Sequence, residues 1–317
     1  MAGEKPNIYG GQAVIEGVMF AGKTVHVTAV RHKHEGIKFY EVPRKQRKWV
    51  QLIGKIPFVR GLLAIILASA SGAKHLNFSA EVYADGEIED GEKPSEPQKP
   101  EKKSWSETLT LIFGVSVVGV LSFLFGKFVF TLVPAIVEDF LFGDLFQNQI
   151  GHNLIEGGIK IILLVGYILL IAQTPLIKRL FQYHGAEHKV ISAYEAGKEL
   201  TIENVQKFST LHYRCGSSFM VLTVLIGVFV YSLVQYDDLW DRVLQRLYLL
   251  PVVIGLSFEV LRWTNQLRDT PILRYLGYPG LWLQLLTTKQ PTDDQVEVAI
   301  ASFNRMLEAD AKAEKQS

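Results

Sequence analysis

The sequence has little cysteine and little net charge. Cys215 is the single cysteine among 317 residues, so an intrachain disulfide and a Cys-x-x-Cys metal site are both excluded. The formal net charge is only +1, and no stretch interleaves basic with aromatic residues as nucleic-acid surfaces do. We therefore expect no nucleic-acid partner. Residues Met1 to Tyr9 lack an apolar core, so we also expect no cleavable signal peptide.

Apolar residues are abundant instead. They make up 48% of the chain, and the mean hydropathy is +0.17. A membrane-spanning helix takes about 20 apolar residues. Four segments approach or reach this length, at about 109–133, 155–174, 218–234 and 247–263. The sequence therefore predicts a mainly α fold, a polytopic helix bundle in the lipid bilayer with about four transmembrane helices. A shorter apolar run at 56–70 is interpreted as an interfacial or packed helix, with spanning as the less favoured alternative.

The distribution of basic residues predicts the orientation of the bundle. Residues 134–153 contain no Lys or Arg, whereas 175–216 carry Lys178, Arg179, Lys189, Lys198, Lys207 and Arg214. Because Lys and Arg accumulate in cytoplasmic loops, the first segment should be external and the second cytoplasmic. We thus expect a multi-pass protein of the cell membrane with both termini in the cytoplasm.

Four regions follow from this pattern. Residues 1–80 should form a small cytoplasmic β-hairpin domain plus the interfacial helix, and 81–107 a disordered linker rich in Glu, Lys and Pro. Residues 108–290 should form the membrane domain, and 291–317 a C-terminal cytoplasmic helix and tail. The expected hairpin pairs 24–31 with 37–42, and we expect Gly10 to Met19 to add a third strand.

The C-terminal helix has a clear start and one apolar face. Thr292 and Gln295 match a capping box. Val296, Ile300 and Phe303 then recur at helical spacing, which predicts that the helix docks on another part of the protein.

One motif carries the spacing of a metal site. In Tyr-His-Gly-Ala-Glu-His-Lys at 183–189, His184 and His188 stand one helical turn apart and can bind one ion, with Glu187 beside them. The order His-x-x-Glu-His is the reverse of the His-Glu-x-x-His zinc motif, in which a carboxylate takes a proton from metal-bound water. The alternative interpretation is that both histidines cap or pair at the lipid headgroup boundary.

A third ligand could come from elsewhere in the chain. His212 and Cys215 follow in the same cytoplasmic segment. Glu259 lies toward the cytoplasmic end of the fourth predicted span, where a carboxylate needs a partner. An ion pair of Glu259 with Arg262 or Lys160 is the alternative.

The glycines at 10, 11 and 17 around Gln12 and Glu16 indicate close approach of backbone to another group. Gln12 and Glu16 are therefore further candidate site residues. A glycine-rich entry into a strand explains the same pattern without a site.

Several of these stretches together resemble a known family. They are Gly-Gly-Gln-Ala-Val-Ile-Glu-Gly-Val-Met at 10–19, the motif at 183–189, Arg-Cys-Gly at 214–216 and Pro-Gly-Leu-Trp-Leu-Gln at 279–284. They are similar to the YqhQ-like family of bacterial membrane proteins, a domain of unknown function described as predicted metal-dependent enzymes. The resemblance implies membrane placement and a metal ion, and it implies no substrate.

Together these patterns predict an integral membrane, metal-dependent enzyme, a peptidase-like hydrolase at the cytoplasmic face. A divalent metal, expected to be Zn²⁺, would be held by His184, His188 and either Glu259 or His212, with Glu187 as general base. The substrate would be a membrane-proximal protein segment or a lipid-linked molecule. The alternative is a non-catalytic assembly or regulatory factor, or a transporter, that binds an ion or partner at the same cluster. No pattern specifies an oligomeric state.

Overall fold

The structure is a computed structural model that describes residues 9–44, 48–91, 126, 128–143, 145, 148–267 and 270–315. The chain forms two compact units. The first comprises Met1–Asp90, Tyr167–Thr223 and Ile254–Ser317, and the second comprises Gly91–Gly166 and Val224–Val253. The first unit contains the sheet and the site described below.

A four-stranded antiparallel sheet opens the first unit, in the order β1-β2-β3-β4. Its strands are β1 (Gly10–Val14), β2 (Gly17–Ala21), β3 (Val25–His32) and β4 (Gly36–Pro43). The predicted hairpin is confirmed as β3 and β4. Gly10 to Met19 forms parts of two strands where one was expected, because the chain reverses at Glu16, whose φ is 52°.

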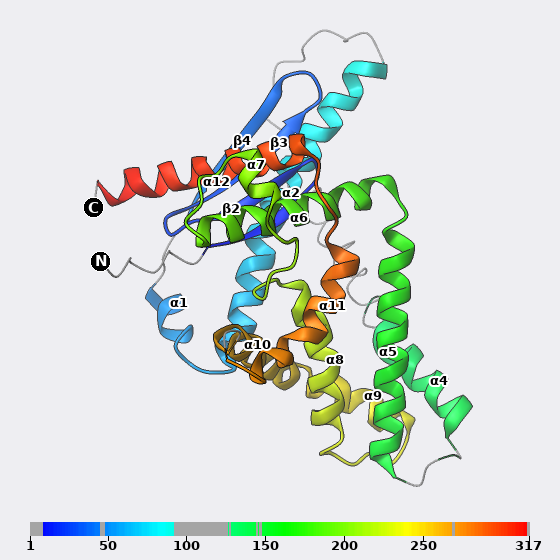
Figure 1. Cartoon of the computed structure of the whole chain (residues 1–317). Coiled ribbons are helices and arrows are strands. Elements are labelled where there is room, and N and C mark those ends of the chain that lie inside the picture. The colour runs from blue at the N-terminus through cyan, green and yellow to red at the C-terminus, as the bar shows by residue number, and fades with distance from the viewer. Residues whose placement is uncertain are drawn as a thin grey trace, which may run out of the picture. The chain divides into compact units, whose positions relative to one another are not determined.

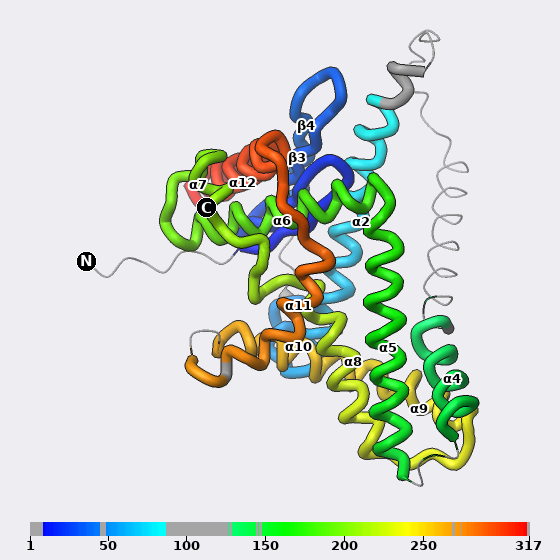
Figure 2. Tube along the Cα trace, turned by 45° about the vertical axis from the view of Figure 1, so that its right-hand side comes forward, coloured from blue at the N-terminus to red at the C-terminus, as the bar shows by residue number. Residues whose placement is uncertain are grey.

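The two faces of the sheet carry different helices. On one face Val27 and Phe20 pack with Phe303 of α12 (Asp293–Glu314) and Val190 of α6 (Pro175–Glu195). Figures 1 and 2 show α6 and α12 beside the strands. The predicted C-terminal helix is confirmed, with its capping box at Thr292. Since it packs on the N-terminal sheet, the two ends of the chain share one core.

The other face of the sheet contacts α2 (Val59–Gly91). The buried His75 ring lies 2.6 Å from the Thr28 hydroxyl, and Val82 packs with Val14 and Val30. Helix α2 is longer than the helix expected at 56–70, and it extends past residue 81, where the linker was expected to begin. The rest of the predicted linker, at 92–107, lies outside the described residues.

Shorter helices complete the first unit. They are α1 (Lys48–Ile53), α7 (Ile202–Gln206), η2 (Leu273–Gly277) and α11 (Tyr278–Thr287), together with parts of α5 (Gln149–Ile171), α8 (Ser217–Tyr231) and α10 (Leu250–Gln266). The last three helices also contribute residues to the second unit.

The second unit is built around buried charges. It contains η1 (Phe128–Leu132), α4 (Val133–Phe142) and α9 (Leu239–Tyr248). Arg242 donates to Glu138 at 2.7 Å and to Glu156 at 2.6 Å, and Arg246 donates to Glu156 at 2.8 Å. All four side chains are buried. The predicted loop at 134–153 thus contains α4 and the start of α5, whose acids pair with the arginines of α9.

Fewer candidate spans are found than were predicted. Within the described residues, Val59–Gly86 and Gln149–Ile171 are long and apolar enough to cross a membrane. Helices α9 and α10, bent by 51°, give a third if they count as one span. The span expected at 109–133 lies mostly outside the described residues, and the one at 218–234 is the 15-residue helix α8. The expected four-span bundle is therefore not confirmed.

Candidate metal centre

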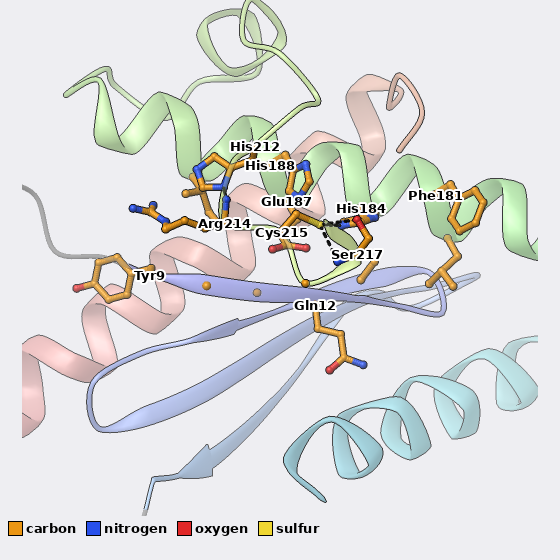
Figure 3. A pocket seen from close by; sticks show the side chains of 16 residues that line it. Tyr9, Gln12, Phe181, His184, Glu187, His188, His212, Arg214, Cys215 and Ser217 are labelled. Carbon is orange, nitrogen blue, oxygen red and sulfur yellow. Dashed lines mark hydrogen bonds between the residues drawn. The ribbon is translucent and has the colours of Figure 1, made fainter. Parts of the chain in front are cut away.

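The His-x-x-Glu-His motif lies in the middle of α6. His184 and His188 are one turn apart, and their ring centroids are separated by 4.5 Å. Proline at the first helical position and the extended Thr174 before it set the start of α6. The motif is helical, as its spacing predicted, so both imidazoles project from one side of the helix (Figure 3).

Backbone carbonyls orient both imidazoles. His184 Nδ1 lies 2.9 Å from the Thr287 carbonyl oxygen, and His188 Nδ1 lies 2.5 Å from that of Thr210. A carbonyl oxygen can only accept, so each Nδ1 carries the hydrogen, and in the neutral ring each Nε2 keeps a lone pair. Metal-binding histidines in proteins are held in the same way, with the non-coordinating ring nitrogen donating to a carbonyl or carboxylate.

Cys215 completes a cluster with the two rings. Its sulfur lies 3.1 Å from His184 Nε2, and the ligand atoms of His184, His188 and Cys215 all lie within 4.8 Å of one another. Bonds of about 2.0–2.3 Å to a tetrahedral ion place ligand atoms roughly 3.3–3.8 Å apart. The three side chains therefore fit one zinc-sized ion after small movements.

The sulfur is itself held from the start of α8. Ser217 directs its hydroxyl oxygen to Cys215 Sγ at 3.0 Å and its backbone N–H at 3.4 Å. Hydrogen bonds of this kind stabilise a coordinating thiolate. Sequence reasoning missed Ser217, although its position two residues after the only cysteine, at the start of an apolar run, was a usable signal.

Helix α11 holds the site together. Gln284, fully buried, accepts from the His212 backbone N–H at 2.8 Å and donates to the His212 carbonyl oxygen at 2.8 Å. The segment after α11 passes directly over Gly185, where a β-carbon would collide with the Lys289 carbonyl oxygen. A glycine inside the motif is thus required for close packing. Gln284 was not identified from the sequence either, although a polar amide side chain within an otherwise apolar stretch indicates a residue with a buried hydrogen-bonding role.

Glu187 faces the sheet from the same helix. Its side chain is 5% exposed, and its carboxylate accepts the backbone N–H of Gly11. Burial raises the pKa of Glu187, partly offset by the nearby His184 and His212. A β-carbon at Gly11 would lie 2.9 Å from Glu187 Cγ, so the structure shows the close approach that the N-terminal glycines indicated.

A cavity of about 320 Å³ connects these groups (Figure 3). It is lined by β1, α6 and the segment around Cys215: Tyr9, Gly10, Gly11, Gln12, Ala13, Leu180, Phe181, His184, Glu187, His188, Ile191, His212, Arg214, Cys215, Gly216 and Ser217. Burial lowers the pKa of His188, partly offset by Cys215. A neutral imidazole is the form that binds a metal ion.

His212 was expected to be close to the pair, and it is. Its ring centroid lies 5.7 Å from that of His188. Its Nε2 atom lies 3.8 Å from a carboxylate oxygen of Glu195, which also pairs with Arg214. Among the described residues, the cluster of possible ligand atoms therefore includes Cys215 and not His212, which lines the same cavity.

Glu259 lies in a different environment. Its carboxylate accepts from Arg60 Nε at 2.7 Å and from the Phe58 backbone N–H at 3.2 Å. Its ion-pair partner is Arg60, and Lys160, one of the two expected partners, pairs with Glu156 instead. Glu259 belongs neither to the ligand cluster nor to the cavity lining, so the expectation that it is the third ligand gains no support.

The two N-terminal candidate residues, Gln12 and Glu16, lie in different surroundings. Gln12 lines the cavity, but its side chain points toward α2, where it meets Gly72 (Figure 3). Glu16 pairs with Arg179 through both carboxylate oxygens at 2.5 Å. Glu16 thus ties the β1–β2 turn to α6.

Fold and site together define a mainly helical protein with an N-terminal antiparallel sheet, candidate membrane helices and a buried His-His-Cys cluster. The chain belongs to the family described as "Protein of unknown function (DUF1385)", whose model matches residues 56–309. It is 55% identical to "Uncharacterized protein YqhQ" of Bacillus subtilis (strain 168) over 313 residues, covering 98% of this chain and 95% of that protein. No solved structure matches.

Proposed function

We propose that this protein is a membrane-bound, metal-dependent hydrolase. In this proposal His184, His188 and Cys215 hold one divalent ion, and Glu187 is the general base. The observation that supports it best is the pair of carbonyl contacts at Nδ1, which directs both Nε2 atoms toward Cys215. Hydrogen bonds that served only to stabilise the fold would not require both Nε2 atoms and the Cys215 sulfur to point toward one common position.

The donor set favours zinc. Two imidazoles and a thiolate suit a borderline-soft ion, and catalytic zinc sites keep three protein ligands and one open position. A bound ion of this kind would lower the pKa of a coordinated water toward neutrality. Because the site lies beside a cavity, a substrate can reach that open position.

Glu187 is placed to move a proton. Its carboxylate is buried in the cavity wall, and burial raises its pKa toward the range useful for a general base. During hydrolysis of an amide, water oxygen bonds to the carbonyl carbon and the carbon–nitrogen bond breaks. Glu187 would accept one proton from water and return it to the leaving nitrogen, so the products are a carboxylic acid and an amine.

The membrane placement belongs to the same proposal. The apolar helix Gln149–Ile171 supports it, as do the exposed apolar side chains of α5, such as Ile162 and Leu170. We propose a multi-pass protein whose basic segment 175–216, with the cluster, lies on the cytoplasmic side. Its substrate would then be a protein segment or a lipid-linked molecule near the membrane.

The test combines metal analysis with hydrolysis in H₂¹⁸O. Purified wild type should carry one zinc ion per chain, and His184→Ala and Cys215→Ala should lose it. Glu187→Gln should keep the ion, because an amide has nearly the same shape, but should slow ¹⁸O incorporation into peptide or lipid products by about 10²–10⁴-fold. Glu203→Gln, on the exposed surface of α7, is the matched control.

Three outcomes would contradict the proposal. A wild-type protein that binds no divalent ion would remove the metal centre. Full hydrolysis by Glu187→Gln would remove the general base. An ion retained without any Glu187-dependent hydrolysis would favour the non-catalytic assembly factor.

A further inference from the structure

We propose that the substrate is an extended polypeptide segment that binds as an added strand along the free edge of β1, across the His-His-Cys cluster. This inference rests on the proposed hydrolase function and specifies its substrate class.

The first step concerns the edge itself. Strand β1 is terminal in the sheet, and β2 is its one partner among the described strands. In an antiparallel pair, alternate residues direct their N–H and C=O groups away from the partner strand. Gly11 is one of these, because its N–H reaches the Glu187 carboxylate. Ala13, two residues further, has the same orientation.

The second step concerns the shape of the cavity. One wall is the backbone of β1 from Gly10 to Ala13, and the other is α6 from Leu180 to Ile191. In Figure 3, β1 and α6 run side by side with the cluster between them. Phe181 lies toward one end, and Tyr9 and Arg214 lie toward the other. A ligand that follows this cavity passes the cluster lengthwise, which suits a linear chain.

The third step concerns what lies along the edge. Among the described residues, a β-carbon at Gly10 would meet nothing within 4 Å, so the face of the sheet is open at the start of β1. Natural sheets usually protect an edge with charged side chains, proline or bulges. Here the edge carries glycines and Ala13 and borders the candidate metal centre. The N–H of Gly11 is bonded to Glu187, so an added strand would pair with the outward backbone groups of Ala13 and hold its own carbonyl groups near the cluster.

Selectivity follows from this mode of binding. Main-chain hydrogen bonds recognise any extended peptide, and side-chain pockets add preference. The apolar pair Leu180 and Phe181 at one end of the cavity favours a large apolar substrate residue there. We therefore expect broad sequence tolerance combined with a strict need for an extended backbone.

The experiment begins with the whole zinc-loaded protein in detergent and two probes. One is a tryptic digest of bacterial membrane proteins, and the other is vesicles of phosphatidylglycerol. The best-cleaved peptide is then synthesised with a single N-methyl group at each amide in turn. Pairing with β1 predicts that kcat/KM falls at least tenfold at alternate positions only, because every second N–H faces the strand.

A protein variant tests the same pairing from the other side. Ala13→Pro removes one outward N–H, and proline is tolerated at edge positions whose N–H faces away from the sheet. We expect it to raise KM for the peptide at least tenfold while zinc content is unchanged. If this variant fails to fold, the N-methyl series still decides the question.

The outcomes separate this inference from the hydrolase proposal. Peptide cleavage with no alternation in the N-methyl series would overturn edge pairing and leave the hydrolase intact. Glu187-dependent hydrolysis of phosphatidylglycerol without peptide cleavage would overturn the peptide substrate alone. If neither probe is hydrolysed by protein that carries zinc, both proposals fail.

Discussion

Gly185→Ala is the sharpest test of how the site is built, because it adds one carbon where backbone blocks it. A β-carbon there would come closer than 3.0 Å to the Lys289 carbonyl oxygen, a separation that real β-carbons essentially never show. The Lys289 segment is also tied to α6 by a 2.9 Å hydrogen bond from its N–H to the Phe181 carbonyl oxygen. Backbone cannot rotate aside as a long side chain can, so the segment must move away from α6.

The expected magnitude follows from the neighbouring contact. The Thr287 carbonyl oxygen lies 2.9 Å from His184 Nδ1, and a movement of about 0.7 Å would lengthen that contact beyond hydrogen-bond range. Loss of such an outer contact typically weakens metal binding by about 10–100-fold. Overpacking should also lower the free energy of unfolding by about 1–3 kcal/mol.

The assay is competitive zinc titration against a chromophoric chelator, combined with thermal unfolding. The matched control is Gly158→Ala in α5, where a β-carbon meets nothing within 4 Å among the described residues. The control should keep wild-type zinc affinity. A Gly185→Ala protein with wild-type zinc affinity and wild-type stability would refute the idea that α11 and its following segment hold His184 in place.

Three further predictions concern charges and topology. Arg246→Met should lower the free energy of unfolding by about 3–5 kcal/mol, measured in detergent, because it leaves the buried Glu156 carboxylate short of a partner. Glu259→Gln should lower the melting temperature while zinc content stays unchanged, since Glu259 pairs with an arginine and not with the ion. Cysteines at Asn148 and Lys198 should differ on intact cells: an impermeant thiol reagent should label the first, and the second only after permeabilisation.

Each of these has a control or a contrary result. Lys207→Met breaks an exposed pair and should leave the free energy of unfolding almost unchanged. An equal cost for Arg246→Met would mean that the buried network contributes no more than a surface pair. Zinc loss in Glu259→Gln would return that residue to the ligand set. Labelling of position 198 but not of position 148 would reverse the orientation.

Local patterns predicted the parts that depend on neighbouring residues. The i, i+4 spacing of His184 and His188 requires only a helix, and α6 is one. The β3–β4 hairpin and the capped helix α12 were likewise predicted, because turn residues, alternation and capping act within a few positions. Helix α4 and the start of α5, within 134–153, were missed because that segment was interpreted as a loop from its lack of Lys and Arg.

Local sequence patterns could not predict contacts between residues that lie far apart in the sequence. Composition could not choose among Glu259, His212 and Cys215 as partner for the histidine pair. Packing made the choice: Cys215 lies 31 positions from His184 and meets it, whereas Glu259 meets Arg60, 199 positions away. All three candidate side chains can bind a metal ion, so helical periodicity alone did not favour any of them.

The sequence by itself determined the two imidazoles on one helix face, the carboxylate between them and the apolar segments. Tertiary structure alone decided that Thr287 and Thr210 orient the rings, that Cys215 joins them, and that β1 borders the cavity. The physical reason is that helix and strand periods arise from each residue and its near neighbours. A metal site is closed by groups that only the packing of α6, α8, α11 and the sheet brings together.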